Sequence, residues 1–84
     1  MNKNIFFRNI PKVDVLLEKK EIVSLVKKYD RNIVVDVIRE EIDKLRNFIK
    51  ESENLELIED KINNLTENII KNTEKVYSYN SRLE

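Results

Sequence analysis

The chain lacks the residues on which many catalytic and metal sites depend. Its 84 residues include no cysteine, histidine, glycine or tryptophan, and only one proline. Without cysteine and histidine, we exclude a structural zinc site and a Cys/His or Ser/His nucleophile pair. Without glycine, we exclude the phosphate-binding loops of nucleotide enzymes. We therefore expect that this chain is not an enzyme by itself and that it holds no metal and no cofactor.

Long apolar segments are missing as well. No run approaches the roughly 20 residues that cross a bilayer. The amino-terminal Ile5-Phe6-Phe7 is not followed by the apolar segment and cleavage site of a signal peptide. These three residues could anchor the chain to a membrane surface, but packing on a helical core is favoured. Because no disulfide can form, a reducing compartment also fits, and we predict a cytoplasmic protein without a membrane partner.

The apolar residues that are present predict an all-α protein of four helices. Pro11 favours a short helix that begins at or just after it and ends near residues 18–20. A second short helix is expected over residues 22–29, where the basic pair Lys27-Lys28 suits the carboxyl-terminal end of the helix. The acidic pairs Glu40-Glu41 and Glu59-Asp60 point in different directions on a helix, so we expect solvated side chains and no acid/base dyad.

Two long helices are predicted to follow and to pack as an antiparallel hairpin. Asp30 is suited to cap the first, over residues 31–50, and Ser52 or Asn54 to cap the second, from residue 55. Each carries an apolar stripe at spacings of three and four. The stripes are Val35, Ile38, Ile42, Leu45 and Ile49, and then Leu55, Ile58, Ile62, Leu65, Ile69 and Val76.

We expect a single domain, in which residues 1–50 form the binding region and residues 51–84 the fourth helix and a connector. Asn72 interrupts the second stripe, and either sets the register of an oligomer or marks where the helix leaves the core. Tyr77 and Tyr79 could stack on nucleobases, although core packing is favoured. The final Leu83-Glu84 fits either native sequence or a remnant of cloning.

Charge is balanced overall but not along the chain. Residues 1–31 contain eight bases and four acids, a net +4, and the remainder contains eight bases and twelve acids, a net −4. A basic helical surface can bind RNA phosphates, although on charge alone a solvated mixed-charge surface is the simpler interpretation. The candidate binding residues are Arg8, Lys12, Lys19, Lys20, Lys27, Lys28 and Arg31.

Two segments resemble one enzyme family. Residues 8–17, RNIPKVDVLL, resemble the opening motif of bacterial selenocysteine synthase (L-seryl-tRNA(Sec) selenium transferase), in which Leu-Pro-Ser-Val-Asp leads into a Leu-Leu pair. Residues 29–46, YDRNIVVDVIREEIDKLR, are similar to its Tyr-Gly-Arg and following amphipathic helix. Residues 51–84 are similar only as a helical connector. Lys12 stands where Ser is common, which removes a helix cap, and Asp30 stands where Gly is usual, although Asp tolerates left-handed backbone.

The resemblance implies a role in substrate recognition. Family members are cytoplasmic pyridoxal-phosphate enzymes that convert seryl-tRNA(Sec) to selenocysteinyl-tRNA(Sec) and assemble as decamers. Their helical amino-terminal domain grips the D-arm of tRNA(Sec), and pyridoxal 5'-phosphate binds in the downstream domain. The seven basic residues would then contact tRNA(Sec). The alternative is a helical protein–protein interaction or oligomerisation module, because the two apolar stripes could serve a partner helix.

Overall fold

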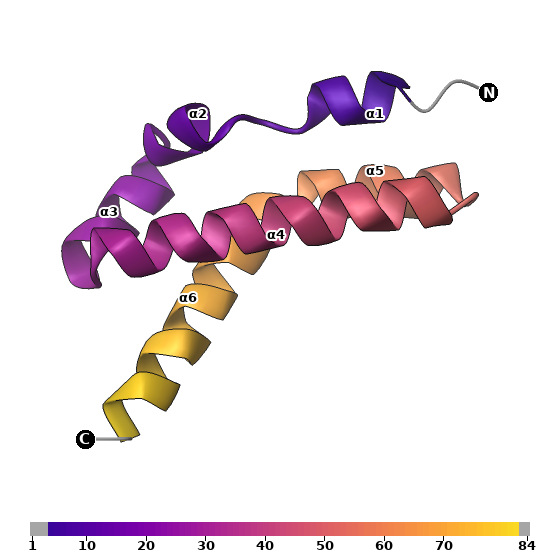
Figure 1. Ribbon diagram of the computed structural model, residues 1–84. Helices are drawn as coiled ribbons and strands as arrows, with labels where there is room; N and C mark the ends of the chain where they lie inside the picture. Colours follow the sequence, from indigo (N-terminus) through magenta and orange to yellow (C-terminus); the bar gives the residue numbers. More distant parts are fainter. Residues whose placement is uncertain (1–3, 83–84) are drawn as a thin grey trace.

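The computed structural model describes residues 4–82, and the side chains of residues 4–78. Over this range the chain is all-α, without a β-strand, which confirms the predicted fold class (Figure 1). The described part has six helices, not four: α1 Asn4–Asn9, α2 Val13–Leu17, α3 Lys20–Lys28, α4 Arg31–Glu51, α5 Leu55–Asn63 and α6 Leu65–Arg82. The side chain of Tyr79 and the pair Leu83-Glu84 lie outside the described residues. No helix in the described range is long and apolar enough to cross a membrane.

The two predicted short helices are present as α2 and α3. Lys12, at the N-cap of α2, makes no side-chain cap hydrogen bond, as expected where a lysine replaces serine. Helix α1 was not predicted. Phe6 and Phe7 pack against the core from α1, whereas Ile5 is 58% exposed. Packing of the apolar triplet on the helical core is therefore confirmed for its two aromatic residues.

Helix α4 is the centre of the fold, because every other helix contacts it. Its start is capped as predicted: the Asp30 carboxylate accepts a hydrogen bond from the Asn32 backbone N–H at 2.9 Å. The Asp30 backbone is extended (φ −85°, ψ 135°), so the turn needs no left-handed residue. The buried face of α4 is wider than the predicted stripe, since Val34 and Val37 are buried while Val35 is only half-buried. Contacts with helices on several sides account for this width.

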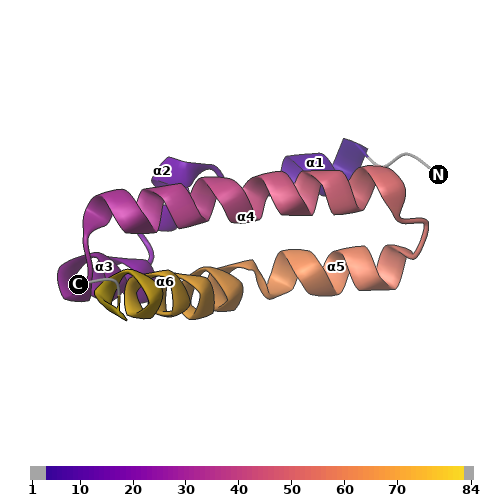
Figure 2. The same cartoon turned by 60° about the horizontal axis from the view of Figure 1, so that its bottom comes forward.

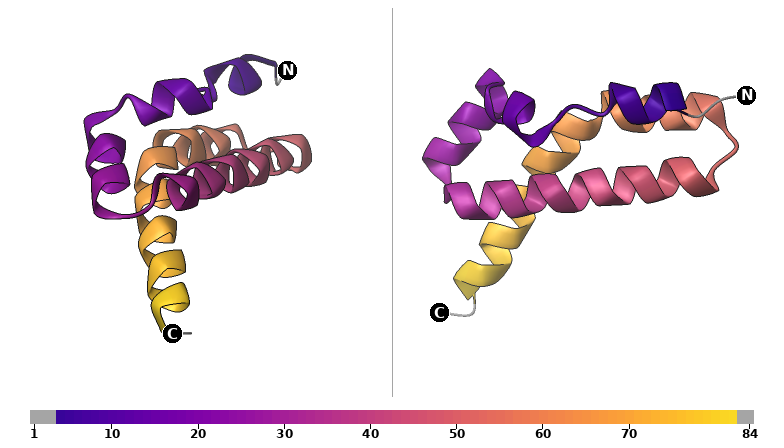
Figure 3. Two further views of the ribbon diagram at one scale, coloured as in Figure 1. Left: turned by 60° about the vertical axis from the view of Figure 1, so that its left-hand side comes forward. Right: turned by 45° about the horizontal axis from the view of Figure 1, so that its top comes forward.

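The second long helix is replaced by two helices, α5 and α6, so the predicted long antiparallel hairpin is not confirmed in that form. Asn54 caps α5 as expected, because its side chain accepts from the Leu57 N–H at 3.1 Å. Asn64 separates α5 from α6 with φ −93° and ψ 4°. Asparagine side chains compete for backbone hydrogen bonds and favour helix ends. Helix α5 runs alongside α4 (Figure 2), whereas α6 crosses α4 at a steep angle (Figure 3).

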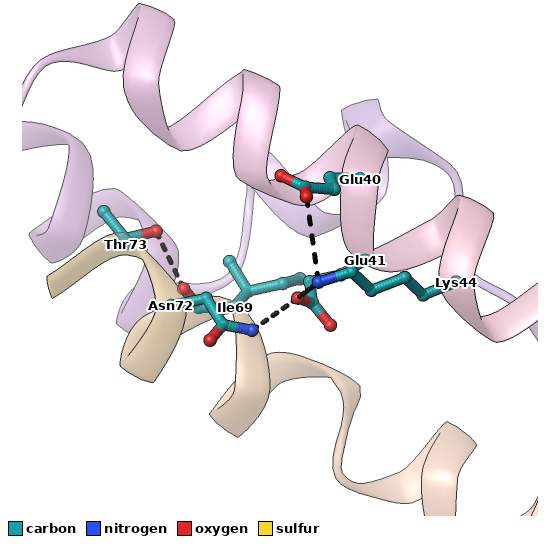
Figure 4. Close-up of polar contacts among 6 residues, drawn as sticks. All are labelled: Glu40, Glu41, Lys44, Ile69, Asn72 and Thr73. Atoms are coloured by element: carbon teal, nitrogen blue, oxygen red, sulfur yellow. Dashed lines mark hydrogen bonds and ion pairs between the residues drawn. The ribbon is translucent and has the colours of Figure 1, made fainter. Parts of the chain in front are cut away.

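A partly buried polar contact joins α4 and α6 (Figure 4). The Asn72 side-chain amide on α6 donates to the carboxylate of Glu41 on α4. Lys44 Nζ lies 3.5 Å from the same Glu41 carboxylate and 3.7 Å from that of Glu40. Glu41 is only 9% exposed, so the prediction that both acids of this pair are solvated was wrong for Glu41. Asn72 joins two helices of one chain. The side chains of residues 74–78 are all exposed, so Asn72 also lies close to the point where α6 leaves the core, as one of the two interpretations predicted.

Candidate nucleic-acid interface

Helix α3 presents lysines on the face that points away from the core. Ile22 and Leu25 are buried, and they define its inner side. Lys20 and Lys27 are seven residues apart and both exposed, so they share the opposite face, two turns from each other. The basic side chains of this face are directed to solvent, where an anionic partner can reach them.

Two lysines stand at the amino-terminal end of α3, where positive charge opposes the helix dipole. Lys20 is the first residue of the helix, and Lys19 precedes it without a side-chain cap hydrogen bond. Lys19 Nζ instead donates to Thr66 Oγ1 on α6 at 3.2 Å. An ammonium group has three donors, so this bond leaves Lys19 able to bind an anion. Helix stability does not explain basic residues at this end, which favours a binding role.

The carboxyl-terminal end of α3 is basic and lies beside a shallow groove. Lys27 and Arg31 line this groove of about 320 Å³ with three apolar side chains, Leu17, Val23 and Val26. Such a groove offers cations at its rim and apolar surface between them.

Aromatic side chains lie next to this end of α3. Lys28 Nζ lies 5.4 Å from the ring centre of Tyr29, within the range of a cation–π contact. The Tyr29 ring packs on Tyr77 of α6, with ring centres 4.8 Å apart and a tilt of 60°. Tyr77 is thus engaged in intramolecular packing, although 44% of it remains exposed.

The two remaining candidate binding residues, Lys12 and Arg8, do not lie on α3. Lys12 lines a separate groove of about 420 Å³, between the segment that joins α1 to α2 and the middle of α4. Two arginines of α4, Arg39 and Arg46, line the same groove. They were not among the predicted residues because they lie in the acidic part of the sequence. Their seven-residue spacing was the available signal. Arg8 is exposed on the last turn of α1.

All seven predicted residues are therefore exposed, but no single groove collects them. Lys27 and Arg31 share one groove, Lys12 lines another with two unpredicted arginines, and Lys19 is bound to α6. The part of the chain that the structure describes contains no group of three or more His, Cys, Asp or Glu side chains able to hold a metal ion.

One comparison with known proteins gives a match. Residues 7–46 match the family model described as selenocysteine synthase N terminal. No curated protein and no solved structure matches the chain. The matched segment runs from Phe7 in α1 to Arg46 in α4, so it includes all seven predicted basic residues and the two arginines of the second groove. It ends before α5, which agrees with the restriction of the resemblance to the first part of the chain.

Proposed function

Because residues 7–46 match the family model described as selenocysteine synthase N terminal, we propose that this chain is a tRNA-recognition domain. Its partner is tRNA(Sec), held through the D-arm. In the full enzyme, a downstream domain carries pyridoxal 5'-phosphate and converts the seryl group to selenocysteinyl. That enzyme is cytoplasmic and assembles as a decamer. The present chain selects the substrate and takes no part in the chemistry.

The observation that carries the proposal is the solvent-facing basic surface of α3 inside the family segment. Lysines stand at both ends of this helix, and Lys20 and Lys27 share its outward face. Lysine ammonium groups neutralise phosphates and release counterions, which supplies affinity without reading sequence. Structured RNA is recognised largely through its shape and backbone. A rigid helix with spaced cations suits that kind of recognition.

The test is a salt titration of tRNA binding by the 84-residue chain. The double variant Lys20→Ala/Lys27→Ala should weaken binding of tRNA(Sec) and lower the slope of log K against log salt concentration by about 1 for each lysine. Fluorescence anisotropy at several salt concentrations measures both quantities. An elongator seryl-tRNA serves as the competitor that tests selectivity.

A charge-matched control is available on α6, outside the family segment. Lys71→Ala/Lys75→Ala removes the same two charges from exposed positions, and it should leave affinity and salt slope nearly unchanged. Equal losses in the two double variants would show that net charge alone governs binding. Unchanged binding in a folded Lys20→Ala/Lys27→Ala variant would remove α3 from the interface.

A protein-interaction module is the second candidate, and exposed apolar side chains favour it. Val15 on α2 is 50% exposed and Val23 on α3 is 37% exposed. The apolar stripes that first suggested this function are largely used inside the fold, since Ile58, Leu65 and Ile69 are buried. Sedimentation equilibrium tests self-association, because a chain that stays monomeric at all concentrations would exclude it.

A further inference from the structure

We propose that the groove between the α1–α2 segment and α4 is a second RNA-backbone site, in which Lys12, Arg39 and Arg46 bind two phosphates of one strand. The inference rests on the proposed function, because it takes the partner to be a folded RNA. It adds a contact surface on α4 that is separate from the lysines of α3.

The groove is built on buried apolar residues, so its shape is fixed. Ile10 and Ile42, which line it from opposite sides, are 8% and 7% exposed. Pro11 restrains the backbone of the joining segment, and it lies next to Lys12 at the rim. The cations therefore stand on ordered backbone.

The charged side chains of the groove carry a net positive charge. Three bases, Lys12, Arg39 and Arg46, face one acid, Asp43. Within the described residues, no ion pair shorter than 4.0 Å involves any of the four. All three bases are exposed. Their donors are thus available, and the planar fork of each arginine can bind a phosphate with two parallel hydrogen bonds.

The position of Asp43 indicates two phosphates and not one. Asp43 follows Arg39 by four residues and precedes Arg46 by three, so all three project from one side of α4. A carboxylate there repels an anion held midway between the arginines. Arg39 and Arg46 stand about 10 Å apart along the helix axis, at 1.5 Å per residue. Phosphates placed beside each arginine avoid Asp43, and a phosphodiester chain supplies two linked phosphates where free phosphate supplies only one.

The test compares two double variants of the 84-residue chain in the same anisotropy assay with tRNA(Sec). Arg39→Ala/Arg46→Ala should weaken binding by about tenfold or more, since each lost charge-assisted contact contributes appreciably. The salt slope should fall by about 2. Arg39→Lys/Arg46→Lys keeps the charge without the fork, so it should restore most of the slope and only part of the affinity. Circular dichroism checks that each variant is folded, as expected for exposed side chains.

The outcomes separate this inference from the proposed function. If the unchanged chain does not bind tRNA(Sec), the proposed function fails and this inference fails with it. If Lys20→Ala/Lys27→Ala weakens binding while folded Arg39→Ala/Arg46→Ala does not, only the second site is refuted. An NMR titration with inorganic phosphate tests whether the groove binds a single small anion. Saturable shifts of residues 39–46 at millimolar phosphate, equal to those caused by RNA, would indicate a small-anion site and overturn the two-phosphate site.

Discussion

The contact between Asn72 and Glu41 should contribute measurably to stability, and Asn72→Ala tests this. The substitution removes the amide that donates to the carboxylate of Glu41, a residue that is only 9% exposed. A hydrogen bond to a charged group contributes about 1.5–3 kcal/mol. Lys44 Nζ, 3.5 Å from the same carboxylate, still offsets part of the burial of the charge. We therefore expect a loss near the lower end, about 1.5 kcal/mol in the free energy of unfolding.

The same substitution also raises the helix propensity of α6, which stabilises the protein and opposes the loss of the hydrogen bond. A matched control is therefore needed. Alanine has a higher helix propensity than asparagine by up to about 0.7 kcal/mol. Asn68 lies one turn earlier on α6, is also half-buried, and makes no side-chain hydrogen bond among the described residues. Asn68→Ala should gain the same propensity without losing a partner. The difference between the two variants then isolates the contact with Glu41.

Urea unfolding followed by far-UV circular dichroism measures both variants, with the slope m checked for constancy. A third variant, Glu41→Met/Asn72→Leu, should recover much of the stability, because removing both partners leaves no unpaired buried group. The reasoning is refuted if Asn72→Ala is no less stable than Asn68→Ala.

Three further predictions concern the fold and its separation from binding. Asp30→Ala removes the cap of α4 and should cost about 1 kcal/mol, read from the urea midpoint, whereas Asp30→Asn should cost much less; equal losses would contradict the capping role. Ile38→Ala opens a cavity in the buried face of α4 and should lower the free energy of unfolding by about 2–5 kcal/mol. Calorimetry would report this loss as partial or complete unfolding, and a fully stable variant would show that α4 is not the centre of the core. Raising NaCl to about 1 M should change the free energy of unfolding by less than about 1 kcal/mol, because exposed ion pairs contribute little. The same salt should abolish RNA binding. A loss of stability that parallels the loss of binding would mean that binding and folding are not separable.

Local patterns were sufficient to predict α2, α3 and α4. Pro11 and the Asp30 cap delimit α2, α3 and α4 close to their observed bounds. Helix α1 was missed because three consecutive apolar residues, Ile5-Phe6-Phe7, have no helical period. The break at Asn64 was missed for the opposite reason: the stripe continues from Ile62 to Leu65 across it. A hydrophobic period records which residues face the core, not whether the backbone bends between them.

Contacts between distant residues could not be predicted. Glu41 meets Asn72 from 31 positions away, and nothing in either local segment specifies the other. The candidate site follows the same rule. The exposed lysines of α3 follow from helical periodicity, whereas the proximity of Lys12 to Arg39 and Arg46 depends on how the α1–α2 segment lies along α4.

The central position of α4 has a consequence for the entropy of binding. Every other helix contacts α4, and α4 itself carries Arg39 and Arg46. The lysines of α3 and the arginines of α4 therefore keep a fixed separation before any ligand arrives. The two proposed RNA-binding surfaces would then need no ordering of the protein backbone on association, which would remove one of the costs of binding. An RNA whose backbone does not match that separation must deform to reach both, so the spacing itself would act as a filter on RNA shape.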